Sequence, residues 1–175
     1  KHINQILARP AAARTVATVI HEATHQLAFN SGLQRRFADN PMWLSEGLAI
    51  YFETPDVTRR RGWSKIGGLH TARLATLQRY LVTRPPDSLF TLLTDDQRFR
   101  DTQTAEDAYA EAWALNYFLM RQRPQQFADY LRLIAAKPAL GQDTSEQRVL
   151  DFQHSFGQSW QELDTEFMRS VADWR

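Results

Sequence analysis

Apolar residues recur at spacings of three and four along most of this chain, the periodicity of helices that bury one face. The first such run extends from about Arg14 to Phe29, and "NSG" ends it, with Gly32 suited to a left-handed cap. One face of this helix consists of Val16, Ile20, Ala23 and Leu27. We expect that stripe to face the core, with His21 and His25 on the opposite side.

The same periodicity predicts further helices, separated by proline and glycine. They cover about residues 42–53, 69–82, 105–121, 124–136, 144–156 and 158–173. The apolar segment "SLFTLLT" has no clear period and is expected to be a short strand or a turn. The pattern therefore predicts a mainly α fold of six or seven helices, with little or no β-sheet.

No repeat, low-complexity tract or linker interrupts the 175 residues. We therefore expect one domain spanning residues 1–175. Its core would cover about residues 14–122, and C-terminal helices would cover about residues 123–175.

Charge, cysteine content and the length of apolar runs argue against several classes of function. The chain has 21 basic and 20 acidic residues, which gives no broad field for nucleic acid or an anionic membrane. The basic run "RRRGWSK" at 59–65 is more typical of a solvated loop than of a nucleic-acid site. The absence of cysteine excludes disulfides, zinc ribbons and thiolate nucleophiles. No run of about 18 apolar residues occurs, so we expect no stable insertion of this segment into a membrane.

The stretch "HEATH" at 21–25 carries the most specific chemistry. On a helix, His21 and His25 lie on one face with Cβ atoms about 5–6 Å apart. Two imidazoles at that spacing can reach one zinc ion at about 2.0–2.1 Å each. Glu22 sits one residue further round, where it can act as general base for a water at an open position of the metal. The alternative is a polar helix face whose histidines only form hydrogen bonds.

A third ligand has to come from outside this helix. The pattern HExxHxxGxxH would need glycine at 28 and histidine at 31, where Ala28 and Ser31 stand. The segment "WLSEGLA" instead supplies Glu46, and its small neighbour Gly47 allows close packing of two helices. Two imidazoles and one carboxylate leave zinc one open position, as in catalytic sites. Glu46 could also be an exposed helix carboxylate, with Glu53 as the reserve ligand.

Supporting groups are less clearly indicated. Peptide hydrolysis needs a donor for the developing oxyanion, and Tyr109 is the first candidate, with Tyr117 and His70 as alternatives. Each of these side chains could equally be a core residue at the rim of the fold. A ligand histidine usually donates its second N–H to an oxygen acceptor. The sequence does not choose among the candidate acceptors Asn30, Glu53 and Glu111.

Three segments together resemble a known family. "HEATHQLAFNSGL", "PMWLSEGLAIYFE" and "AYAEAWALNYFL" look like the gluzincin metallopeptidases, and most like peptidase-MA-like bacterial domains of unknown function. The resemblance covers about residues 15–122, and "FGQSWQELDTEFM" is similar to the end of such domains.

The resemblance implies a zincin-like helical fold with zinc held by His21, His25 and Glu46, and Glu22 as general base. It also implies an exported protein, periplasmic or extracellular. Zincins commonly place a small sheet before the HExxH helix, whereas only about 14 residues precede it here.

These observations lead to one main hypothesis, a zinc-dependent peptidase that acts on a peptide or protein substrate. Glu22 would be the general base and Tyr109 the oxyanion donor. Two alternatives remain: a catalytically silent metal-binding or protein-interaction module that keeps the zinc site, and a helical scaffold without metal. The sequence gives neither substrate preference nor oligomeric state.

Overall fold

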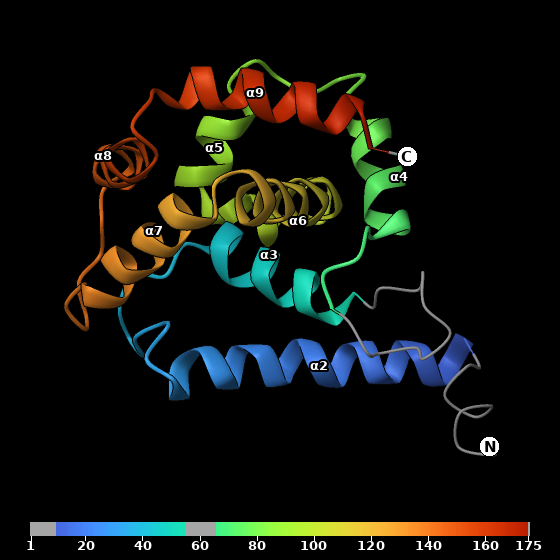
Figure 1. The fold of residues 1–175 in the computed structure, drawn as a ribbon, viewed down its shortest axis with the longest axis horizontal. Helices are drawn as coiled ribbons and strands as arrows, with labels where there is room; N and C mark the ends of the chain where they lie inside the picture. The colour runs from blue at the N-terminus through green and yellow to red at the C-terminus, as the bar shows by residue number, and fades with distance from the viewer. Residues whose placement is uncertain (1–9, 55–65, 175) are drawn as a thin grey trace.

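The computed structural model describes residues 10–54 and 66–174, and the predicted loop at 59–65 lies outside these ranges. The described chain is mainly α-helical and contains no β-sheet, as expected (Figure 1). Its helices are α2 (Pro10–Asn30), α3 (Met42–Glu53), α4 (Thr71–Tyr80), α5 (Ser88–Thr94), α6 (Ala105–Gln122), α7 (Pro124–Ala136), α8 (Ser145–Phe156) and α9 (Trp160–Ala172), with a 3-10 turn η2 (Asp96–Phe99) before α6. Within these ranges no helix is both long and apolar enough to cross a bilayer.

Helix α6 forms the centre of the fold. It packs against α3, α4, α5, α7, α9 and η2, and Figure 1 shows it nearly end-on inside this ring of neighbours. Ten of its residues are buried: most are small or apolar, and the two polar ones, Glu111 and Asn116, are hydrogen-bonded. A helix that is apolar all round is typical of a core position.

The crossing of α3 and α6 depends on Gly47. A Cβ atom there would lie 2.0 Å from Nδ2 of Asn116 and 2.5 Å from the carbonyl oxygen of Ala112. Asn116 donates hydrogen bonds to the carbonyls of Trp43 at 3.0 Å and Ala112 at 2.9 Å. Gly47 was expected to let its helix approach the "HEATH" helix closely, but it packs against α6 instead, and this contact fixes α3 on the central helix.

The segment "SLFTLLT" is a helix, so the expectation of a strand or turn was wrong. Leu89, Leu92 and Leu93 follow the helical spacing and are fully or almost fully buried. Seven residues were too few for this period to be distinguished from a buried strand.

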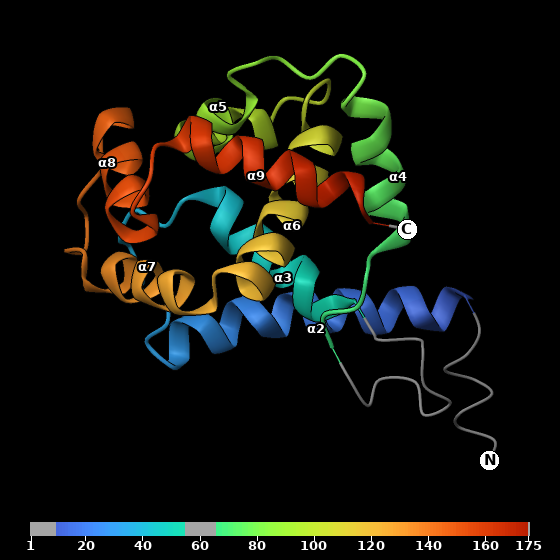
Figure 2. The same cartoon turned by 45° about the horizontal axis from the view of Figure 1, so that its top comes forward.

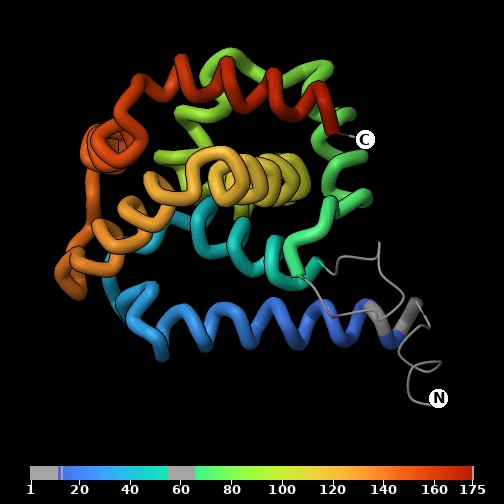
Figure 3. The backbone as a smooth tube through the Cα atoms, in the orientation of Figure 1, coloured from blue at the N-terminus to red at the C-terminus, as the bar shows by residue number. Residues whose placement is uncertain are grey.

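Helix α2 runs along one edge of the molecule and packs against α3 (Figures 1 and 3). Its expected core face does not enter the core: Leu27 is 66% exposed, and its neighbour Val19 is 61% exposed. The helix instead directs Ala28, His21 and His25 towards α3, where two carboxylates meet the imidazoles. Charge pairing across α2 and α3 overrides the apolar periodicity here.

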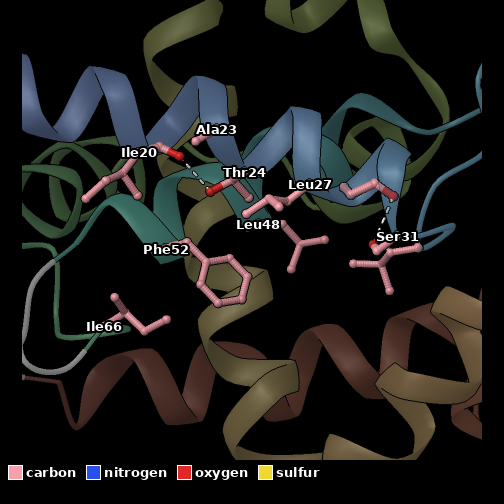
Figure 4. Close-up of a pocket in the computed structure, with 10 residues that line it drawn as sticks. Ile20, Ala23, Thr24, Leu27, Ser31, Leu48, Phe52 and Ile66 are labelled. Atoms are coloured by element: carbon pink, nitrogen blue, oxygen red, sulfur yellow. Dashed lines mark hydrogen bonds between the residues drawn. The ribbon is translucent and has the colours of Figure 1, made fainter.

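An apolar groove follows from this placement. Its volume is about 470 Å³, and it lies along α2, the apolar side of α3 and the segment that leads into α4 (Figure 4). Its lining includes Ile20, Thr24, Leu27, Leu48, Phe52 and Ile66.

The connection from α2 to α3 is held by charged side chains. Arg148 of α8 donates to Asp39 at 2.9 and 2.6 Å and to Asp96 at 2.8 Å. Asp96 in turn accepts a hydrogen bond from the first backbone N–H of α3, at Met42, at 3.0 Å. Figure 2 shows α8 on the side where α2 turns into α3. The pairs tie the start of α3 to two other elements and so fix the position of the side chains one turn further along.

Candidate metal centre

The structure brings His21 and His25 of α2 together with Glu46 of α3. Their donor atoms all lie within 4.8 Å of one another, and each residue is only partly exposed. The Nε2 atoms of His21 and His25 are 3.2 Å apart. The carboxylate oxygens of Glu46 lie 3.3 Å from Nε2 of His21 and 3.6 Å from Nε2 of His25. The site thus joins two helices through one turn of each.

These distances can be compared with those between neighbouring ligand atoms in tetrahedral metal coordination. Ligand bonds of about 2.0–2.2 Å in tetrahedral geometry place neighbouring donors about 3.3–3.6 Å apart. The two Nε2 atoms are 3.2 Å apart, Oε2 of Glu46 lies 3.3 Å from His21, and Oε1 of Glu46 lies 3.6 Å from His25, so each histidine has its own nearest carboxylate oxygen near this range. Two imidazole nitrogens and a carboxylate oxygen are also the donor types that zinc accepts. His21, His25 and Glu46 therefore form a possible metal site.

Glu53 fixes the orientation of His21. Its Oε2 atom lies 2.9 Å from Nδ1 of His21, so this ring directs Nε2 towards Glu46 and His25. The other oxygen, Oε1, lies 3.7 Å from Nε2 of His70. His70 is itself held at the start of α4, where its Nδ1 accepts a 3.3 Å hydrogen bond from the backbone N–H of Arg73. A carboxylate behind a ligand histidine is the usual support of a metal site.

Charges in the metal-free site are strongly coupled. Hydrogen bonds to Glu46 and then to Glu53 raise the pKa of His21 to about 9, against the effect of burial. Burial raises the pKa of Glu53, but hydrogen bonds from His21 and His70 outweigh it and lower this pKa to about 2. His21 therefore carries a proton between two carboxylates at neutral pH, and a metal ion would take the place of that proton.

Glu22 and Tyr109 take different positions around this cluster. Glu22 is exposed, next to His21 on α2. Tyr109 of α6 is partly buried, with its ring edge-on to Phe99 and the Arg73 guanidinium 5.5 Å from its centroid. Burial raises the pKa of Tyr109, and the charge of Glu46 raises it further. Tyr109 is therefore close enough to the cluster to sense the charge of Glu46.

Tyr117, an alternative candidate for the oxyanion donor, packs in an aromatic cluster. Tyr117 packs among Tyr51, Trp113 and Trp174, and the Arg121 guanidinium lies 4.4 Å from its ring centroid.

The alternative acceptors for a ligand histidine are also occupied elsewhere. Asn30 accepts from Arg36, and the fully buried Glu111 accepts from Arg84, Arg98 and Ser88. Of the three acceptors that the sequence left open, Glu53 is the one that contacts a histidine of the cluster. The signal for it was its position two turns after Glu46, whereas nothing in the sequence indicated its pairing with His70 across residues 55–65.

Comparison with known proteins gives one match. The family model described as "Protein of unknown function (DUF1570)" matches residues 15–141, a span that contains His21, Glu22, His25, Glu46 and Tyr109. No curated protein and no solved structure matches the chain.

Proposed function

This chain belongs to the DUF1570 family, and from the chemistry of its site we propose that it is a zinc-dependent peptidase of the gluzincin type. One observation carries the proposal: two imidazole nitrogens and a carboxylate oxygen lie within 4.8 Å of one another, and Glu22 follows His21 directly in the sequence. Three protein ligands leave a fourth position open, which distinguishes catalytic from structural zinc sites.

His21, His25 and Glu46 would hold the ion. When bound, zinc supplies a Lewis acid that polarises a carbonyl group and lowers the pKa of a water molecule to about 7. Glu53 keeps His21 in the orientation and tautomer that ligation requires, because it accepts the hydrogen bond of Nδ1.

Glu22 is assigned the proton transfers. Its carboxylate takes a proton from the attacking water and delivers it to the leaving amine as the peptide C–N bond breaks. The exposure of Glu22 supports this role, because a base must reach solvent and substrate. Metal binding alone would not require a carboxylate at this position of the motif.

In this proposal Tyr109 stabilises the developing oxyanion. A tyrosine phenol is protonated at neutral pH, and burial raises the pKa of Tyr109 further, so its O–H can donate a hydrogen bond to developing negative charge. The nearby Arg73 guanidinium stacks on the same ring and restrains it. Loss of one such donor typically costs about 100- to 1000-fold in turnover.

The substrate in this proposal is a peptide or protein, since the near-neutral charge balance offers no broad surface for nucleic acid. Export of the protein follows only from the resemblance to exported metallopeptidase domains. The rival function is a silent metal-binding or interaction module, which predicts the same zinc affinity but no hydrolysis.

Hydrolysis of a peptide library by zinc-loaded protein, compared with a Glu22→Gln variant, separates these functions. The peptidase proposal predicts cleavage by the wild type and a loss of at least about 100-fold in the variant, with equal zinc content. The substitution is matched in size at an exposed position, so we expect no loss of stability. Equal silence of both proteins with zinc bound would establish the module instead.

A further inference from the structure

Arg73 is a partly buried cation that has no carboxylate partner among the described residues. Within residues 10–54 and 66–174, every other buried or half-buried arginine forms an ion pair: Arg84 and Arg98 with Glu111, Arg123 with Glu166, and Arg148 with Asp39. The Arg73 guanidinium instead lies 5.5 Å from the ring centroid of Tyr109. A guanidinium that is partly shielded from water and has no carboxylate beside it keeps its hydrogen-bond donors available for an anionic ligand.

The position of Arg73 relative to the metal centre defines where such a ligand would bind. One route runs through Tyr109, which contacts Arg73 on its ring face and senses the charge of Glu46. A second route runs through α4, where the Arg73 backbone N–H holds His70 and His70 faces Glu53. Arg73 therefore contacts Tyr109 through its guanidinium and His70 through its backbone, and these two residues interact with Glu46 and Glu53 of the cluster.

The chemistry of the side chain narrows the ligand. The planar fork of arginine donates two parallel hydrogen bonds to a carboxylate, which makes it a specific receptor for that group. An extended peptide advances about 3.3–3.6 Å per residue, so only a carboxylate close to the scissile bond can lie beside the oxyanion donor. A free C-terminus is the carboxylate that every peptide carries.

We infer that Arg73 binds the C-terminal α-carboxylate of the substrate, so that the enzyme removes residues from the carboxyl end of peptides. The inference rests on the proposed peptidase function and adds its substrate class. Arg73 takes no part in the covalent steps: water adds to the carbonyl carbon, the C–N bond breaks, and Glu22 transfers the proton to the amine. The guanidinium sets which peptide bond is presented.

The direct test uses matched N-acetylated peptides with either a free or an amidated C-terminus. Zinc-loaded wild type should show a kcat/KM about 10- to 100-fold higher for the free acid, the range of a charge-assisted hydrogen-bonded pair. The Arg73→Gln variant should bring the ratio of the two peptides to about one, with zinc content measured in parallel. The control is Arg79→Gln, an exposed arginine on the same helix that bonds only Thr76 and should keep the wild-type ratio.

Binding measurements make the inference testable without turnover. Calorimetric titration of the zinc-loaded Glu22→Gln variant with the same two peptides should give at least about tenfold tighter binding of the free acid. Adding Arg73→Gln to that variant should abolish the difference. Equal affinities for acid and amide with Arg73 intact would overturn the inference, whereas acid-selective binding without hydrolysis by the wild type would refute only the peptidase function.

Discussion

Zinc binding at this site should weaken steeply as the solution is acidified from about pH 8 to about pH 7. In the metal-free protein, hydrogen bonds to Glu46 and Glu53 raise the pKa of His21 to about 9. The Nε2 atom of His21 that faces Glu46 is also the one that would bind the ion. A zinc ion must therefore displace a proton across this entire interval.

The size of the effect follows from the pKa. A solution at about pH 7 is about two pH units below the pKa of His21. Removing the proton from His21 at that pH costs about 2.7 kcal/mol, at about 1.36 kcal/mol per unit, and this cost is subtracted from the free energy of zinc binding. This corresponds to an apparent dissociation constant roughly 100-fold weaker than at a pH above the pKa, with about a tenfold change per pH unit. A histidine with the ordinary pKa of about 6.5 would change zinc affinity only slightly in this interval.

Competition titration with a chromophoric chelator between about pH 7 and pH 8 measures this slope. Calorimetry in two buffers of different ionisation enthalpy counts the protons released, and about one is expected. A Glu53→Gln variant supplies the control, because loss of one of the two carboxylates should lower the His21 pKa and move the steep region to lower pH. A dissociation constant that stays constant in the wild type would show that His21 is neutral in the free protein and that zinc displaces no proton there.

Three further predictions concern stability. Gly47→Ala should destabilise the fold by about 1–3 kcal/mol in chemical denaturation, because the added methyl meets a backbone carbonyl at 2.5 Å; Gly141→Ala, with its nearest neighbour at 3.4 Å, should cost clearly less. Arg148→Gln should cost about 3 kcal/mol, since it leaves Asp39 and Asp96 without their cation, whereas Arg132→Gln removes only an exposed pair and should cost less than about 1 kcal/mol. Equal losses for the two arginines would contradict that ranking. Because the His21 pKa rises from 6.5 to about 9, its contribution to the stability of the metal-free protein is complete below about pH 6.5 and is lost as the pH rises through 9. Thermal unfolding without metal should therefore occur at a lower temperature near pH 9.5 than near pH 7, and a His21→Gln variant should show a smaller difference.

Local patterns predicted the site better than they predicted the packing of its helix. The pairing of His21 with His25 depends only on the helical repeat, and the recruitment of Glu46 required only a second helix laid against the first. Which side of α2 faces the core depends on the side chains that the neighbouring helix presents to it. The apolar stripe was assigned to the core, but α2 meets Glu46 and Glu53, and the charged pairing turned the histidines inward.

Features that join distant segments were not predictable from local sequence. His70 lies at the start of α4 and contacts Glu53 at the end of α3. Arg73 of α4 contacts Tyr109 of α6. That Arg73 has no carboxylate partner in the part of the chain that the structure describes is a property of the packed structure. Sequence patterns gave no reason to prefer this arginine to any other.

The placement of α2 at the edge of the fold has a consequence for the order in which parts of the molecule come apart. With an apolar side left open to solvent, this helix has little hydrophobic anchorage, and its charged links to α3 pass through the same imidazoles that would ligate an ion. A bound cation would thus act as a cross-link between α2 and α3. Chelation should accelerate amide hydrogen exchange in the first helix well before it does so in the central α6, which would keep its protection until the whole fold opens.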